Sequence, residues 1–173
     1  MKPLFVCYAN CCRSVLAEYL YRHLCDRPAM SGGVDPGLTI NENACAMLAY
    51  WGIDARSHEP KWASREMCEE AAGIFVMGPR YLRTLLDIQG DNLASKSYLF
   101  SDPFSKPVSF AQGAYTVDDP SFDDRPSLEI VKDFDWFRER VLQVRNALLG
   151  HGRGLVPASK YLDELRSLDS YGY

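Results

Sequence analysis

A cysteine, an arginine and a serine stand close together near the start of the chain. Five residues separate Cys7 from Arg13, and Ser14 follows Arg13 directly. A cysteine beside a cation is a strong nucleophile, because positive charge lowers the thiol pKa from about 8.5 to roughly 3.5–7.5. The planar guanidinium of Arg13 can bind two phosphate oxygens at once, and the Ser14 hydroxyl could donate to the sulfur. These residue types together predict nucleophilic attack on a phosphate ester.

The segments on either side of these residues should form a strand and a helix. Residues 4–7 are an apolar run, and apolar residues recur at helical spacing from Val15 to Leu24. A helix N-terminus leaves backbone N–H groups unpaired and carries partial positive charge. We therefore expect a strand, an anion-binding loop and a helix, with Cys7 at the mouth of the loop. The alternative is a buried strand in which Cys7 is only a core residue.

The whole loop resembles the C-x-x-N-x-C-R-S signature of the low-molecular-weight protein tyrosine phosphatases. The resemblance implies that Cys7 is the nucleophile and that Asn10 and Ser14 support the loop. Ser31 lies in a Ser-Gly-Gly segment similar to one that ends the second strand of the family, so it is expected to hold Asn10; an ordinary turn is the alternative. The residues that the resemblance assigns to phosphate binding are Tyr8, Ala9, Asn10, Cys11, Cys12, Arg13 and Ser14.

A general acid is also implied by the resemblance. Asp119-Pro120 is similar to the Asp-Pro pair that carries this acid in the family. The departing oxygen must be protonated, and a well-placed acid typically contributes roughly 10²- to 10⁴-fold to the rate. The same carboxylate could then deprotonate the water that attacks the cysteinyl-phosphate. Asp118, Asp123 and Asp124 are neighbouring alternatives.

Apolar runs alternate with helical patterns along the rest of the chain. This alternation predicts an α/β fold, a four-stranded parallel sheet with helices on both faces and the active site at the carboxyl ends of the strands. Expected strands are 4–7, 29–31, 73–78 and 96–100. An apolar stripe over 128–148 predicts one long helix ended by Gly150. Residues 1–150 should form the phosphatase domain and 151–173 an extension with a short helix at 157–168, which could dock, mediate dimerisation or stay loose.

Composition narrows the class of protein. The chain has 173 residues, 47% hydrophobic and 24% charged, which suits one soluble domain. A net charge of -4 argues against a nucleic-acid partner. We see neither a signal peptide nor a membrane-spanning run, and no zinc-type spacing among the six cysteines. We therefore expect a cytoplasmic enzyme with reduced thiols, no metal and no cofactor, acting on a phosphorylated protein or a small aryl phosphate.

Substrate preference is less well defined by the sequence. Cys11 stands where many family members carry Ile and the arginine phosphatases carry Thr, so phosphotyrosine is favoured while phosphoarginine stays open. Trp62, in an apparent insertion at 59–62, or Phe122 could supply an aromatic wall. A phosphate-binding module without turnover is a further alternative, and an arsenate reductase ranks lower because no cysteine follows Cys68. Cys12 could trap an oxidised Cys7 as a disulfide, with Cys11 as a competitor.

Overall fold

The fold is built on a parallel sheet. The computed structural model describes residues 1–108, 110, 114–125, 127–151 and 153–168. All strands are parallel, and their order across the sheet is β2-β1-β3-β4. Their bounds are β1 (Pro3–Cys7), β2 (Met30–Gly33), β3 (Gly73–Val76) and β4 (Ser97–Leu99). The predicted α/β class and the four-stranded parallel sheet are confirmed.

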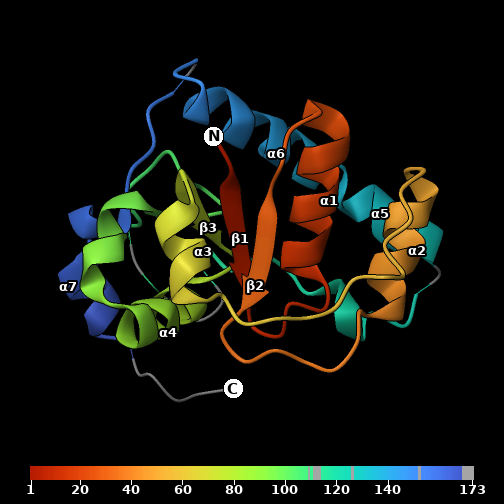
Figure 1. Ribbon diagram of the computed structural model, residues 1–173, viewed down its shortest axis with the longest axis horizontal. Helices are drawn as coiled ribbons and strands as arrows, with labels where there is room; N and C mark the ends of the chain where they lie inside the picture. Colours follow the sequence, from red (N-terminus) through yellow and green to blue (C-terminus); the bar gives the residue numbers. More distant parts are fainter. Residues whose placement is uncertain (109, 111–113, 126, 152, 169–173) are drawn as a thin grey trace.

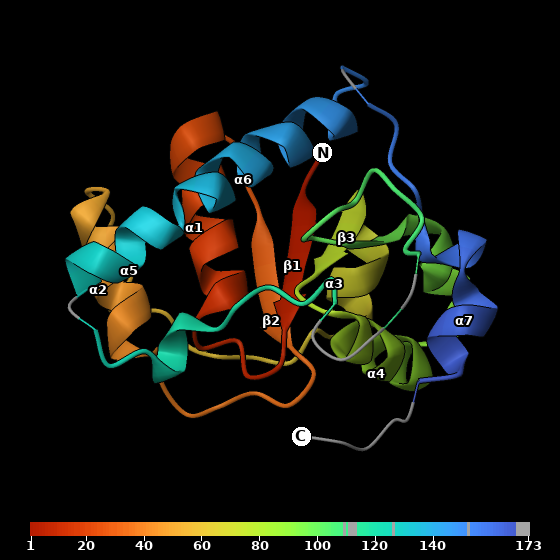
Figure 2. The same cartoon turned by 180° about the vertical axis from the view of Figure 1, so that it is seen from behind.

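Helices cover both faces of this sheet (Figures 1 and 2). Phe5 and Phe75 lie in one buried cluster with residues of the helices α1, α2, α5 and α6. Leu4, Val6 and Ile74 alternate with them and pack on the other face, against α3, α4 and α7. The helices are α1 (Arg13–Cys25), α2 (Glu42–Tyr50), α3 (Arg65–Glu70), α4 (Pro79–Gln89), α5 (Ser127–Asp133), α6 (Asp135–Leu148) and α7 (Leu162–Arg166). Three short 3₁₀ helices are η1 (Asp91–Lys96), η2 (Pro120–Phe122) and η3 (Ala158–Lys160).

The single long helix expected over 128–148 is wrong. The chain forms α5 and α6 there, with Phe134 between them at φ -101° and ψ 10°. The break keeps the apolar stripe buried, because Ile130, Phe134 and Phe137 are all at most 5% exposed. Phe134 also packs on the rings of Trp136 and Phe137. Apolar spacing alone could not reveal this bend, since both halves of the stripe face the same core.

The residues after α6 return to the sheet and dock on it. Ala158, Tyr161 and Leu165 are buried in the cluster that contains Leu82 and Leu85 of α4. The Val156 amide donates to the Pro103 carbonyl at 2.8 Å, and Lys106 pairs with Glu164 at 2.6 Å. Figures 1 and 2 both place α7 beside α4. Residues 153–168 of the extension are therefore docked on the domain, which was one of the three alternatives. Gly152 and residues 169–173 of the extension lie outside the described residues. The domain boundary at residue 150 stays a prediction.

The described part of the chain has no helix that is both long enough and apolar enough to cross a lipid bilayer. Among the same residues, no three His, Cys, Asp or Glu side chains come together in a way that could hold a metal ion.

Candidate active site

Cys7 ends the central strand β1, and the loop of residues 8–12 carries the chain into α1 (Figure 1). Segment 34–41 runs along this loop and fixes it from outside through four backbone hydrogen bonds. The pairs are Val34 N–H to Cys7 O (3.2 Å), Asp35 to Tyr8 (3.0 Å), Gly37 to Ala9 (2.9 Å) and Asn41 to Cys11 (2.9 Å). Gly33 is required for this approach, since a Cβ there would lie 2.5 Å from the Tyr8 carbonyl oxygen.

A chain of hydrogen bonds reaches the sulfur of Cys7. The Ser14 hydroxyl lies 3.0 Å from Cys7 Sγ and accepts from Asn10 Nδ2 at 3.0 Å. A thiolate can only accept, so when Cys7 is ionised the Ser14 O–H is the donor of this hydrogen bond. The second Asn10 Nδ2 hydrogen goes to Ser31 Oγ at 2.9 Å. The structure thus brings together Cys7, Asn10, Ser14 and Ser31 in one hydrogen-bond network.

Asn10 is the most constrained residue of the loop. It is fully buried and adopts the left-handed conformation, with φ 53°. Its Oδ1 accepts from the Lys61 amide at 3.0 Å and lies 3.3 Å from His58 Nε2. Asparagine tolerates this backbone better than most residues, and all of its side-chain groups are bonded here. The segment at 59–62 therefore does more than form surface, because it helps to hold the loop.

Two residues of this network were not identified from the sequence. Glu18 is 7% exposed and accepts a 2.6 Å hydrogen bond from the Ser31 hydroxyl. Its position four residues after Ser14, on one face of α1, is a signal that could have been used. His58 is also 7% exposed, and burial lowers its pKa while Glu18 opposes that effect. Its role depends on a contact across 48 positions of the chain, which periodicity does not reveal.

Arg13 is buried beside the predicted acid. Its Nη2 lies 2.6 Å from Asp119 Oδ2, and its Nη1 donates to the Val117 carbonyl at 3.0 Å. The guanidinium also lies 5.2 Å from the ring centre of Tyr81, a contact the sequence did not suggest. Burial alone would lower the pKa of Arg13, but Asp119 and Cys7 outweigh it, so this pKa is raised. Arg13 is therefore a permanent cation held in one orientation.

The segment that carries Asp119, residues 117–123, is held by the start of α2; we call it the acid loop. Asn43 Nδ2 donates to the carbonyls of Pro120 (2.8 Å) and Asp123 (2.9 Å). Asp119 Oδ1 caps η2 by accepting from the Ser121 amide at 3.0 Å, and its Oδ2 reaches Arg13. The alternative carboxylates have other surroundings: Asp118 and Asp124 are exposed, and Asp123 pairs with Arg125 at 2.6 Å.

The other two loop cysteines differ in environment. Cys12 is 3% exposed and lies in the same buried cluster as Cys7, and burial raises the pKa of its thiol far above its usual value. Cys11 is partly exposed and its Sγ donates to the Ala9 carbonyl at 3.3 Å, with a pKa raised mainly by burial. All six cysteines are described, and all are free thiols.

Two exposed aromatic side chains belong to segments that are bonded to residues of the Cys7 site. Trp62 is 55% exposed, and its backbone forms a parallel bridge to Gly33 at the edge of β2. Phe122 of the acid loop is 86% exposed. The Tyr8 hydroxyl donates to Asp35 at 2.6 Å, and the Tyr8 ring lies 6.0 Å from that of Tyr81. Trp62 and Phe122 are thus available to contact a bound molecule.

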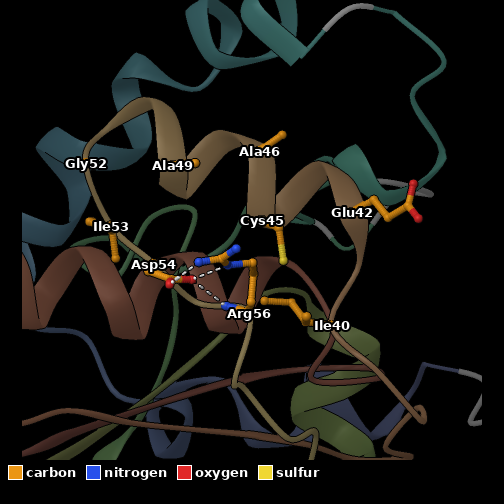
Figure 3. A pocket seen from close by; sticks show the side chains of 9 residues that line it. All are labelled: Ile40, Glu42, Cys45, Ala46, Ala49, Gly52, Ile53, Asp54 and Arg56. Atoms are coloured by element: carbon orange, nitrogen blue, oxygen red, sulfur yellow. Dashed lines mark hydrogen bonds and ion pairs between the residues drawn. The ribbon is translucent and has the colours of Figure 1, made fainter.

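A separate cavity of about 590 Å³ lies beside α2 (Figure 3). One wall is the helix face of Glu42, Cys45 and Ala49, and the segment of Asp54 and Arg56 forms the other. The Arg56 guanidinium donates to Asp54 Oδ2 at 2.7 Å across this wall. None of the residues that bond to Cys7, Arg13 or Asp119 lines this cavity, so it is distinct from the Cys7 site.

Comparisons with known proteins agree with this geometry. The model of the family "Low molecular weight phosphotyrosine protein phosphatase" matches residues 2–148. No curated protein matches the chain significantly.

Among solved structures, the low molecular weight protein tyrosine phosphatase of T. tengcongensis is 22% identical, with a TM-score of 0.68 and coverage of 84% of this chain and 98% of that one. The tyrosine phosphatase AmsI of Erwinia amylovora is 20% identical (TM-score 0.67, coverage 84% and 91%). The arginine phosphatase YwlE, known from Bacillus subtilis, is 20% identical (TM-score 0.67, coverage 83% and 93%). At these identities the solved structures establish the fold, whereas the family model covers most of the sequence. The chain therefore belongs to the low molecular weight phosphotyrosine protein phosphatase family of hydrolases.

Proposed function

We propose that this protein is a phosphatase that cleaves phosphotyrosine monoesters through a cysteinyl-phosphate on Cys7. The observation that carries the proposal is the arrangement around Arg13, which binds the carboxylate of Asp119 while heading the helix that follows the Cys7 loop. A nucleophile, an oxyanion-binding cation and a proton donor therefore meet at one carboxyl edge of the sheet.

The first step transfers the phosphoryl group to the enzyme. The Cys7 thiolate attacks phosphorus, and the bond from phosphorus to the ester oxygen breaks. Arg13 and the loop amides bind the phosphoryl oxygens, where charge is spread in the transition state. Asp119 donates its proton to the departing oxygen. The phosphate dianion takes the place of Asp119 on Arg13 and, by repulsion, favours the protonated form of the acid that this step needs.

The second step returns the enzyme to its starting form. Asp119, now a carboxylate, takes a proton from a water molecule whose oxygen attacks phosphorus. The bond from sulfur to phosphorus breaks and inorganic phosphate leaves. Ser14 stabilises the departing thiolate by donating its hydroxyl hydrogen to Sγ, across the observed 3.0 Å. Asn10 and Ser31 act by orienting Ser14 and the loop, so they are positioning residues.

The phospho-residue is proposed to be phosphotyrosine because Trp62 and Phe122 are exposed aromatic groups on segments that are bonded to residues of the Cys7 site. Phosphoarginine is the second candidate, supported by the small side chain of Cys11 and by the similarity to an arginine phosphatase. A phosphorylated protein or a small aryl phosphate in the cytoplasm is the proposed substrate.

Purified protein should hydrolyse an aryl phosphate, and the Cys7→Ser variant should be inactive. Cys45→Ser is the matched control, since Cys45 lies on α2 outside the site and should leave turnover unchanged. Phosphotyrosine and phosphoarginine peptides, assayed in parallel, identify the substrate class by their ratio of kcat/KM. A wild-type protein that binds phosphate without any turnover would instead be a binding module, which is the rival function.

We also propose that Cys12 protects Cys7 from irreversible oxidation. Peroxide oxidises the Cys7 thiolate to a sulfenic acid; the Cys12 sulfur then attacks it, forming a disulfide and releasing water. Cys12 shares a packed cluster with Cys7, whereas Cys11 is not in that cluster, and this proximity supports Cys12 over Cys11. After peroxide treatment, thiol reduction should restore activity to wild type and Cys11→Ser but not to Cys12→Ser. Loss of recovery in Cys11→Ser alone would assign the role to Cys11.

A further inference from the structure

A second polar cavity lies on α6, between that helix and the chain that follows β4. Its volume is about 450 Å³, within the usual range of roughly 300–1,000 Å³ for small-molecule sites. The lining residues on which the argument rests are Asp102, Phe104, Arg140, Gln143, Asn146 and Arg153. No residue of this cavity bonds to Cys7, Arg13 or Asp119, and none has a place in the proposed reaction.

Two arginines converge on one aromatic ring in this cavity. The guanidinium carbon of Arg140 lies 5.7 Å from the centre of the Phe104 ring, and that of Arg153 lies 5.6 Å from it. The ring attracts each cation, but the cations repel one another. Asp102 is the one carboxylate among the residues that line the cavity. With two arginines and one aspartate, the lining keeps a surplus positive charge.

Arg140 is not satisfied by its neighbours. Its Nη1 is buried and lacks a hydrogen-bond partner, since the closest carboxylate oxygen, Asp102 Oδ1, is 3.9 Å away. A buried N–H group without a partner is costly and calls for an explanation. Burial and the neighbouring Arg153 both lower the pKa of Arg140, and Asp102 opposes them. The cavity is thus lined by a guanidinium whose unpaired Nη1 would be satisfied by an acceptor in the cavity once the partly exposed Arg140 side chain turns toward it.

The remaining polar side chains suit the same kind of ligand. Gln143 and Asn146 place carboxamide groups along the cavity from successive turns of α6. A guanidinium presents a planar set of donors that matches phosphate oxygens, and amides can complete the set. A ligand with several oxygens and negative charge would pair the buried Nη1 and neutralise the surplus charge in one step.

We propose that this cavity binds the phosphate group of a small molecule, at a second anion site separate from the Cys7 loop. Inorganic phosphate and a phosphorylated metabolite share the chemistry that the arginines recognise. The site does not depend on the proposed phosphatase reaction, so it can be present or absent whatever the outcome for Cys7.

Calorimetric titration of the full-length Arg13→Ala variant with inorganic phosphate tests the proposal, because the change disables the Cys7 loop. This variant should still bind phosphate. Adding Arg140→Gln or Arg153→Gln should weaken binding about tenfold or more, as expected for a lost charge-assisted hydrogen bond. Adding Arg138→Gln should leave binding unchanged, because Arg138 lies on the same helix but faces Trp51 instead.

Two further measurements make the result decisive. Arg153 lies in a loop, so its variant tests the site even if Arg140→Gln fails to fold, which thermal unfolding will show. Adenosine monophosphate and adenosine are titrated in parallel to show whether the cavity takes free phosphate or a phosphorylated metabolite. Tighter binding of the nucleotide than of inorganic phosphate indicates a phosphorylated metabolite. No phosphate binding by Arg13→Ala, or equal weakening by Arg138→Gln and the cavity variants, would overturn the proposal.

Discussion

Asp119 Oδ2 lies 2.6 Å from Arg13 Nη2, and Arg13 is the buried partner of the two, with 5% of its side chain exposed against 25% for Asp119. The residues that we propose as acid and oxyanion binder are therefore bonded to each other. In the proposed reaction, a phosphate group and the Asp119 carboxylate compete for this one guanidinium. Asp119 would then influence both proton transfer and phosphate affinity.

The Asp119→Asn variant should separate these two effects. Turnover of an aryl phosphate should fall by roughly 10²- to 10⁴-fold, because the leaving oxygen loses its proton donor. The inhibition constant of inorganic phosphate should also fall, since an amide no longer competes for Arg13 or repels the anion. Steady-state kinetics with phosphate as a competitive inhibitor measure both.

Asp118→Asn is the matched control for this experiment. Asp118 precedes Asp119 and is exposed, so its variant should keep wild-type values for both constants. If Asp118→Asn lost turnover and Asp119→Asn kept it, the acid would have been assigned to the wrong residue.

Replacement of Asn10 should distinguish its hydrogen bonds from its backbone conformation. Both Asn10→Gly and Asn10→Ala remove the bonds to Ser14 and Ser31, but glycine accepts the observed φ of 53°. Alanine in the left-handed region destabilises the folded protein by an additional amount of about 1–2 kcal/mol, because its Cβ is crowded there. The free energy of unfolding measured in urea should therefore be highest for the wild type, lower for Asn10→Gly and lowest for Asn10→Ala. Equal values for Gly and Ala would mean that the backbone of residue 10 is not constrained as described.

Stability should depend on pH through His58. Burial lowers the pKa of His58 below its ordinary value of 6.5, so the unfolded chain binds a proton more readily than the folded protein does near that pH. The stability that neutral His58 contributes is thus fully present above pH 6.5. It is lost as the pH falls from 6.5 through the lowered pKa of His58 in the folded protein. Unfolding free energies at about pH 7.5 and about pH 5.5 should differ more in wild type than in His58→Gln. An unchanged difference in the variant would show that His58 does not cause this dependence.

The docked extension should contribute to stability. Leu165 of α7 is fully buried against α4, so Leu165→Ala should lower the free energy of unfolding by about 2–5 kcal/mol. Leu142→Ala is the control, because Leu142 is 37% exposed on α6 and its variant should cost much less. Unfolding energies that match between the two variants would mean that α7 adds little to the folded domain.

The sheet and the Cys7 loop were predictable because their signals are local. An apolar strand, a five-residue loop and an amphipathic helix stand within the first 25 residues, and the loop geometry follows from their order. The strands β1 and β3 were visible as short apolar runs, whereas β2 (Met-Ser-Gly-Gly) carries a weaker signal and lies at Met30–Gly33 instead of the expected 29–31. The contact of Arg13 with Asp119 was not predicted, since 106 positions separate them; only the family resemblance assigned both residues to one site.

Other parts of the site depend on contacts between distant segments. Asn43 supports the acid loop across 77 positions, and Lys61 bonds to Asn10 across 51. Neither residue type nor spacing marks these partners, because a backbone amide or a surface asparagine is common everywhere. The bend at Phe134 was missed for a related reason: both helices bury the same stripe, so periodicity continues through the break.

The central claim, that Cys7 carries the phosphoryl group, is tested most directly by rapid quenching of a reaction followed by mass spectrometry of the peptides. The protein is mixed with an aryl phosphate and quenched in acid within the first turnover. The account predicts one phosphoryl group, attached to Cys7 and accumulating further in Asp119→Ala if dephosphorylation becomes the slower step. Turnover with no modified residue, or with the phosphoryl group on another side chain, would contradict it.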